Sequence, residues 1–309
     1  MGFDLDKDIV IFNSILERRP EISRDALKTD LERYYLPYAE RLMEIKHHND
    51  SSRGLVIGIS ALQGAGKTTH GEIMCTLLAH LGHTSTVLSI DDHYVTHEQL
   101  NEIRRKDPRF IRRGVTHDIP MAVKNLTALR DMKDGDEVLI PIYDKGAMQG
   151  DGDRVGWKKI TQKPDIIFYD GWMVGVRRVK DESVFDPKLP GLGKPGDIEF
   201  AKDVNRKLDE YLPLWDLLDF IQMLYIPNYH VSLKWREQAE VRLRSQGKGG
   251  MTSEQIREFV YYFWRSVHPA IQIKNLAHSK EYTQQVTIIN ENHDVEEILT
   301  PEQTAVKYP

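Results

Sequence analysis

The segment Ala61-Leu62-Gln63-Gly64-Ala65-Gly66-Lys67-Thr68 brings together the residue types that bind phosphate. Its two glycines let the backbone curl, so that successive N–H groups point inward at one anion. Lys67 would reach the β- and γ-phosphate oxygens of a nucleoside triphosphate, and the hydroxyl of Thr68 would be a ligand of Mg²⁺. Ala61 stands where the strictest form of the pattern has glycine, so this is the relaxed form. The predicted nucleotide-binding residues are Gln63, Gly64, Ala65, Gly66, Lys67, Thr68 and Thr69.

The elements expected around this segment support the same chemistry. The apolar run Leu55–Ile59 predicts a strand, and a helical pattern begins at Lys67. A strand, a glycine-rich loop and a helix start form the unit that cradles nucleotide phosphates, and the helix N-terminus adds partial positive charge. The alternative is a glycine turn with a purely structural role, which the Lys-Thr pair after a strand argues against.

Acidic residues follow two further predicted strands. Asp91 and Asp92 come directly after the strand at 86–90, and Asp170 ends the apolar run at 166–169. Ligands of parallel α/β sheets lie beyond the carboxyl ends of the strands, so these carboxylates are expected near the phosphates. We predict that Asp170 and the loop threonine hold Mg²⁺, and that Asp91 or Asp92 accepts a proton from an alcohol. Alternatively, Asp92 caps the following helix and Asp91 hydrogen-bonds a metal ligand.

Basic residues gather in two irregular segments, 107–118 and 143–154. Such loops are often only solvated surface, but these also contain acidic residues, which could hold the cations in place for an anionic substrate. No extended aromatic platform is evident for a second base, so a small carboxylate or phosphate acceptor fits better than a nucleoside. The candidate acceptor-binding residues are Asp92, Tyr94, Arg113, His117, Asp118, Lys145 and Arg154.

A charged helix predicted near residues 229–244 has the features of a lid. Closure would lay Arg236 and Arg244 across the transferred phosphoryl group and exclude water, with the glycines at 247, 249 and 250 as hinge or tip. A solvated, salt-bridged face is the alternative for such a pattern. The lid is expected at about 228–252, and the candidate catalytic residues are Asp91, Lys67, Arg236 and Arg244.

The composition narrows the class of protein. The chain has 309 residues and a formal charge of −5, which does not favour a general nucleic-acid or membrane binder. Because Cys75 is the single cysteine, no disulfide can form within the chain. The N-terminal residues lack a basic region followed by an apolar stretch, so the cytoplasm is the expected compartment. Alternating strands and helices predict one α/β domain over 1–309 with a doubly wound, mostly parallel sheet, and residues 1–50 as a helical extension.

Six stretches of the chain resemble the D-glycerate 3-kinase family, and they occur in the family's order. They are Ser60–Thr69, Ser89–Thr96, Arg113–Asp118, Tyr143–Lys145, Gly152–Arg154 and Asp170–Met173. That family, which includes fungal ATP-binding relatives, is grouped with uridine kinase, phosphoribulokinase and bacterial pantothenate kinase. The resemblance extends from about residue 55 to 290 and implies a P-loop nucleoside triphosphate hydrolase type of fold. It also implies transfer of the γ-phosphate of ATP, with Mg²⁺, to the 3-hydroxyl of D-glycerate, with Asp91 as base and Arg236 and Arg244 as lid residues.

Three positions depart from the family pattern. His93 stands where the family usually has phenylalanine, Gly146 where serine usually follows the lysine, and Asp170 where glutamate usually ends the strand. Asp170 is one methylene shorter and would reach Mg²⁺ through water. The changes at 93 and 146 are expected to lie toward the acceptor. Two alternatives therefore stay open: the same phosphotransfer to another small hydroxylated metabolite, and a non-catalytic ATP-binding regulatory protein.

Overall fold

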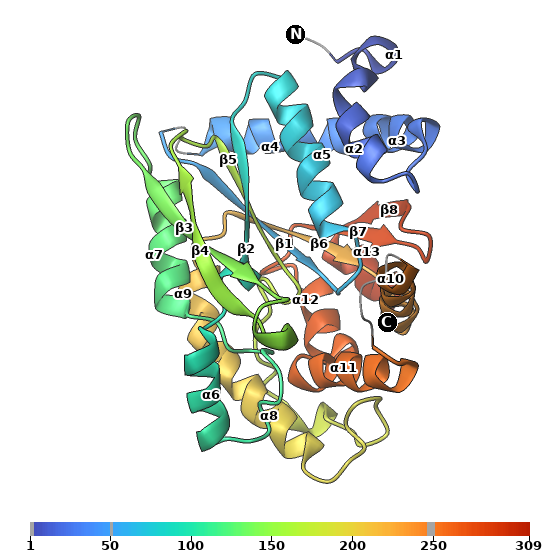
Figure 1. Ribbon diagram of the computed structural model, residues 1–309. Coiled ribbons are helices and arrows are strands. Elements are labelled where there is room, and N and C mark those ends of the chain that lie inside the picture. Colours follow the sequence, from blue (N-terminus) through green and yellow to red (C-terminus); the bar gives the residue numbers. More distant parts are fainter. Residues whose placement is uncertain (1–2, 50–51, 246–250) are drawn as a thin grey trace.

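A six-stranded sheet forms the centre of the protein (Figure 1). The computed structural model describes residues 3–49, 52–245 and 251–309, without the side chains of residues 242–245. The strand order is β2-β5-β1-β6-β7-β8, and every pair is parallel except β7 with β8. The strands are β1 (Leu55–Ala61), β2 (Ser85–Ser89), β5 (Ile166–Gly171), β6 (Phe220–Tyr225), β7 (Gln285–Ile289) and β8 (Val295–Leu299).

The burial of the central strands explains why the sequence shows continuous apolar runs there. All residues of β1, β5, β6 and β7 are buried, since helices cover both faces of a parallel sheet. The doubly wound, mostly parallel α/β architecture is therefore confirmed. The antiparallel edge strand β8 was not anticipated, because its residues alternate between half-buried and exposed and lack an apolar run.

The N-terminal helices lie along one end of the sheet beside α5 (Lys67–His80) (Figure 1). The side chain of Ser23 caps the helix that begins at Arg24 by accepting a hydrogen bond from the backbone N–H of Ala26. The apolar side chains of these helices belong to the same continuous core as the sheet. The helices are α1 (Leu5–Asp8), α2 (Asn13–Arg18), α3 (Arg24–Asp30) and α4 (Leu36–His48).

One strand of the segment between β2 and β5 lies outside the main sheet. It is β3 (Val138–Asp144), which pairs antiparallel with β4 (Asp153–Ile160) in a separate two-stranded hairpin. Eight residues join the two strands, which is too short a connection for a parallel crossover. Strand β4 was not predicted, because four of its eight residues are charged and one is glycine.

The remaining helices pack around the sheet, and α6, α8 and α11 lie beyond the carboxyl ends of its strands (Figure 1). Helix α6 was not predicted, although Thr96 and Gln99 form a capping box at its start. Among the described residues, no helix has the length and apolar character needed to cross a bilayer. The helices are α6 (His97–Lys106), α7 (Ile119–Arg130), α8 (Asp197–Lys207), α9 (Leu212–Trp215), α10 (Val231–Ser245), α11 (Ser253–Ser266), α12 (Lys274–Ala277) and α13 (Pro301–Lys307).

Candidate active site

The phosphate-binding segment joins β1 to α5, as the sequence predicts. Gly64 and Gly66 have φ of +88° and +86°, a backbone conformation that residues with a Cβ rarely adopt. The ammonium of Lys67 donates hydrogen bonds to the carbonyls of Ala61 and Leu62, at 2.9 and 3.1 Å, so the loop itself holds this side chain. Burial lowers the pKa of Lys67, while nearby carboxylates favour its charged form.

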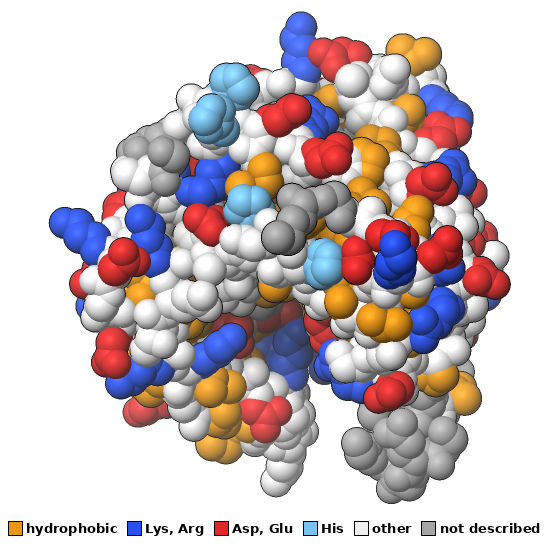
Figure 2. All heavy atoms as spheres, turned by 90° about the horizontal axis from the view of Figure 1, so that it is seen from above, with side chains coloured by type: hydrophobic (Ala, Val, Ile, Leu, Met, Phe, Trp, Pro, Cys, Tyr) orange, Lys and Arg blue, Asp and Glu red, His pale blue; other side chains and the backbone are white. Residues whose placement is uncertain are grey.

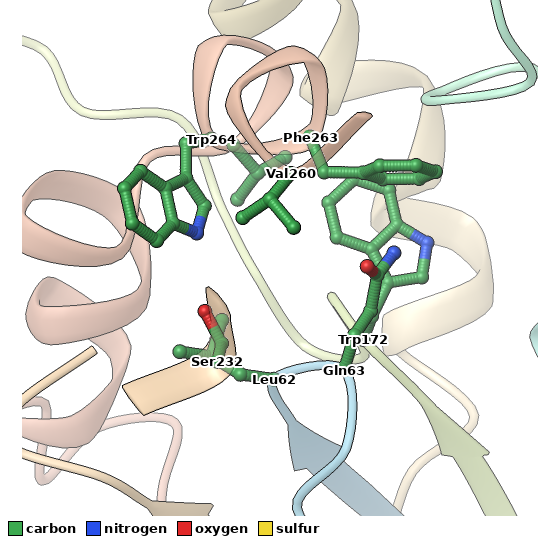
Figure 3. Close-up of a pocket in the computed structure, with 8 residues that line it drawn as sticks. Leu62, Gln63, Trp172, Ser232, Val260, Phe263 and Trp264 are labelled. Atoms are coloured by element: carbon green, nitrogen blue, oxygen red, sulfur yellow. The ribbon is translucent and has the colours of Figure 1, made fainter. Parts of the chain in front are cut away.

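The side chain of Gln63 lines a small cavity beside the loop. Trp172, which follows β5, and Phe263 and Trp264 of α11 line the same cavity (Figure 3). The cavity measures about 20 Å³, enough for a single water.

Three carboxylates lie at the carboxyl ends of neighbouring strands. Asp170 of β5 is level with Ile59 of β1 and Ser89 of β2, and Asp91 and Asp92 follow β2 in a short 3₁₀ turn. Burial raises the pKa of Asp170, and Lys67 opposes that rise. Burial also raises the pKa of Asp92, which accepts a hydrogen bond from a backbone N–H of β3. The predicted convergence of acidic groups at the phosphate loop is thus present in the fold.

This donor set suits Mg²⁺ bound together with phosphate. Among the described residues, no group of three or more His, Cys, Asp or Glu side chains is arranged to hold a metal by itself. Mg²⁺ in phosphotransferases usually takes one or two carboxylates, waters and substrate phosphates. The hydroxyl of Thr68 and the carboxylate of Asp170 fit that pattern, with Lys67 close enough to Asp170 to interact with it electrostatically.

Asp91 forms an ion pair with Lys145, which arrives from the end of the β3–β4 hairpin. The Lys145 ammonium lies 2.5 Å from Oδ2 of Asp91. Burial alone would raise the pKa of Asp91, but Lys145, and more weakly Lys67, bring the pKa below its usual value. Asp91 is therefore ionised at neutral pH and able to accept a proton.

Aromatic rings line the acceptor side of this ion pair. Tyr94 stacks on His117 with ring centres 4.1 Å apart, and the two residues form an isolated β-bridge. The indole N–H of Trp172 donates to the Tyr94 hydroxyl at 3.1 Å, and Tyr143 lies 5.4 Å from the Tyr94 ring. This group of rings was not predicted, because the rings come from four separate segments of the chain.

Several predicted acceptor residues have structural partners. Arg154 donates to the Tyr94 carbonyl at 3.3 Å and lies 3.6 Å from Asp118, which also caps α7. His117 is buried and hydrogen-bonded to the Tyr211 hydroxyl at 2.7 Å. Burial lowers the pKa of His117 to about 3, so it is neutral at pH 7 and is not one of the cations that the sequence analysis counted here.

Two sequence-based expectations are corrected. His93 does not lie toward the acceptor: it is fully buried, with Nε2 3.2 Å from the Asn125 amide of α7 and its ring beside Tyr169. The 3₁₀ turn after β2 directs its side chain into the core. Asp92 does not cap the following helix either, since Thr96 does.

Helices α10 and α11 pack together at the position of the predicted lid (Figure 1). Arg236 pairs with Glu240 on the same helix, and its guanidinium lies 4.8 Å from the ring centre of Phe259 on α11. The side chain of Arg244 and the glycines at 247, 249 and 250 lie outside the described residues. Lid closure therefore stays a prediction.

Sequence reasoning missed two contributors that the fold brings to this site. Tyr143 and the ion pair of Arg104 with Asp151 flank the acceptor residues. The acidic residues of the glycine-rich segment 150–154 were the available signal. Figure 2 shows a face of the molecule that is hollowed at its lower edge, with acidic and basic side chains in the hollow.

Comparisons with known proteins agree with this geometry. A model of the Phosphoribulokinase / Uridine kinase family matches residues 56–210. The chain is 32% identical over 254 residues to the chloroplastic D-glycerate 3-kinase of Arabidopsis thaliana, which covers 75% of this chain and 53% of the plant protein. It is also 32% identical over 256 residues to a probable ATP-dependent kinase of Saccharomyces cerevisiae, over 76% of this chain and 84% of the yeast protein.

The fold is shared with a solved structure. The D-glycerate 3-kinase from Cryptococcus neoformans var. grubii superposes with a TM-score of 0.75 at 22% identity, over 86% of this chain and 98% of that chain. The chain spans only about half the length of the plant relative. From the family model and the two sequence relatives together, the chain belongs to the phosphoribulokinase / uridine kinase family of P-loop kinases.

Proposed function

We propose that the protein is an ATP- and Mg²⁺-dependent kinase that phosphorylates a hydroxyl of a small hydroxy acid, with D-glycerate, giving 3-phosphoglycerate, as the first candidate. The observation that carries this proposal is the Asp91–Lys145 ion pair beside Lys67. It keeps a carboxylate ionised, and therefore able to accept a proton, next to the phosphate loop. The plant and fungal D-glycerate 3-kinases among the relatives favour glycerate over other hydroxy acids.

Each residue then has a defined task. The loop N–H groups and Lys67 would hold the β- and γ-phosphates, and Thr68 and Asp170 would hold Mg²⁺, which neutralises charge on the phosphates. Asp91 would take the proton of the acceptor hydroxyl as that oxygen attacks the γ-phosphorus and the bond to the leaving ADP breaks. Arg236, and Arg244 on the same helix, would stabilise the transferred group once α10 closes.

The test is ADP release by the purified protein with MgATP, with and without D-glycerate, followed by mass and NMR analysis of the product. We expect glycerate to raise the rate of ADP release by at least ~100-fold over the acceptor-free rate, given what an aligned acceptor contributes over water. The product should be 3-phosphoglycerate rather than its 2-phospho isomer.

Other results would redirect the proposal. Stimulation by a different hydroxy acid would keep the reaction and replace the substrate. No stimulation by any hydroxylated acid or alcohol, with ATP binding intact, would favour a nucleotide-binding regulatory protein instead.

A further inference from the structure

The cations around the acceptor side differ in whether an acid neutralises them. Arg104 donates both terminal nitrogens to Asp151, at 2.5 and 2.9 Å. Lys145 is paired with Asp91, as described above. Such pairs leave little net charge for a substrate, since each guanidinium or ammonium already has a carboxylate.

Arg112 and Arg113 are different. Neither has a carboxylate within 4 Å among the described residues, although both are half-buried. Burial and the guanidiniums of Arg113 and Arg236 lower the pKa of Arg112, and Asp151 opposes them without forming an ion pair with it. Because Asp151 is already paired with Arg104, a further anion beside Arg112 and Arg113 would be stabilised.

Only one of these two guanidiniums is on the acceptor side. That of Arg112 lies 4.9 Å from the ring centre of Phe259, on helix α11. That of Arg113 lies 5.7 and 5.4 Å from the ring centres of Tyr94 and Tyr143, and its Nη1 is 3.5 Å from the carbonyl of Lys145. The rings restrict its movement without neutralising it.

The neighbouring backbone leaves space for this guanidinium. A Cβ on Gly152 would lie 2.0 Å from Nη1 of Arg113 and 2.6 Å from a ring carbon of Tyr143. Gly152 also has φ of +81°, so glycine is required here on two grounds. Glycine at position 152 therefore leaves room for the guanidinium of Arg113 and the ring of Tyr143.

We propose that Arg113 binds the carboxylate of the acceptor and that this contact selects an acid over a neutral alcohol. The inference rests on the proposed function and names the group that recognises the substrate class. The distance from Arg113 to Asp91 is spanned by one residue, Lys145, from its carbonyl to its ammonium. This path sets an upper limit on the length of an acceptor that has its hydroxyl at Asp91 and its carboxylate at Arg113, and the planar guanidinium matches a carboxylate.

The test compares D-glycerate with glyceramide, its neutral amide, in the wild type and in Arg113→Gln, Arg113→Lys and Arg109→Gln. Arg109 pairs with Asp107 and Asp203 on the surface of the same segment and serves as the matched control. In Arg113→Gln we expect kcat/KM for glycerate to fall about 30- to 100-fold, the effect of losing a charge-assisted hydrogen-bond pair. Glyceramide should change less than about threefold, Arg113→Lys should recover part of the loss, and the KM for ATP should stay constant.

Calorimetric titration of glycerate onto the protein with a non-hydrolysable ATP analogue gives a readout that needs no turnover. An equal loss for glycerate and glyceramide in Arg113→Gln, or unchanged glycerate binding, would overturn the role of Arg113. If the wild type instead uses another hydroxy acid, the glycerate assignment fails and the same comparison with that acid and its amide decides the role of Arg113. A wild type that prefers the neutral amide overturns both.

Discussion

At the scale of single residues, Asp91 and Asp92 are adjacent but have different surroundings. Asp91 is paired with Lys145, whereas Asp92 accepts a backbone hydrogen bond from Tyr143 at 3.3 Å. We therefore expect Asp91→Asn to lower kcat by about 10²- to 10⁴-fold while ATP affinity changes little, since general-base catalysis contributes that much. Steady-state kinetics and nucleotide titration would measure both quantities. Asp92→Asn is the matched control, and a loss as large as that of Asp91→Asn would move the base to Asp92.

Lys145 gives a pH test of the same ion pair. Its ammonium lowers the pKa of Asp91 against the effect of burial. Without that cation, burial would raise this pKa above its usual value, so a larger share of Asp91 would be protonated in mild acid. The acid limb of the kcat/KM profile for a neutral acceptor should therefore move to higher pH in Lys145→Met. An acid limb at the wild-type position would mean that Asp91 is not the group that titrates.

At the scale of elements, the N-terminal helices are joined to the phosphate-loop helix through a buried polar contact. The Tyr34 hydroxyl, from the π-helical turn Leu31–Tyr35, lies 3.4 Å from Nδ1 of His70 on α5 and also contacts the Gln222 amide of β6. His70 follows Thr68 by two residues, so this contact lies in the first turn of α5. The helical extension at residues 1–50 therefore makes a specific contact with the helix that follows the phosphate loop.

We expect Tyr34→Phe to lower the free energy of unfolding by about 1–3 kcal/mol, because it removes a hydrogen-bonding partner from buried polar groups. Chemical denaturation would measure this. Tyr38→Phe is the control, since the buried Tyr38 hydroxyl has no hydrogen-bond partner among the described residues. Equal losses in both variants would show that the hydrogen bonds of the Tyr34 hydroxyl add nothing measurable to stability.

At the scale of the whole molecule, buried histidines make stability depend on pH. Burial lowers the pKa of His93 from its ordinary value of 6.5 to about 4. The unfolded chain therefore binds a proton between pH 6.5 and 4 that the folded chain does not, so stability is full above pH 6.5 and falls with pH through this window. His70, His117 and His268 are lowered in the same direction and add to the effect.

His93→Phe should flatten part of this dependence. Relative to the wild type, the variant should gain about 2 kcal/mol on going from pH 8 to pH 5, because the protonation penalty of that one residue is absent. Urea unfolding at the two pH values measures the difference. If the difference in unfolding free energy between the variant and the wild type is the same at both pH values, His93 is not protonated on unfolding in that range. Glycerate kinetics should be little affected, since His93 lies in the core and not at the acceptor.

The sequence by itself determined the phosphate loop, the fold class and the family. These follow from contiguous residues: Gly64 and Gly66 set the backbone, Lys67 and Thr68 follow at once, and the buried strands are continuous apolar runs. Local backbone preferences and hydrophobic pattern are properties of short segments, so they can be predicted without the fold. The cap at Ser23 belongs to the same class.

The tertiary structure decided the acceptor side. Lys145 and Asp91 are 54 residues apart, and only the position of the β3–β4 hairpin against the end of β2 makes them partners. The same packing neutralises His117 by burial and turns His93 into the core, while it leaves Arg113 without an ion pair among the residues that the structure describes. Charge state and pairing depend on the sum of all neighbours in space, which no local pattern contains.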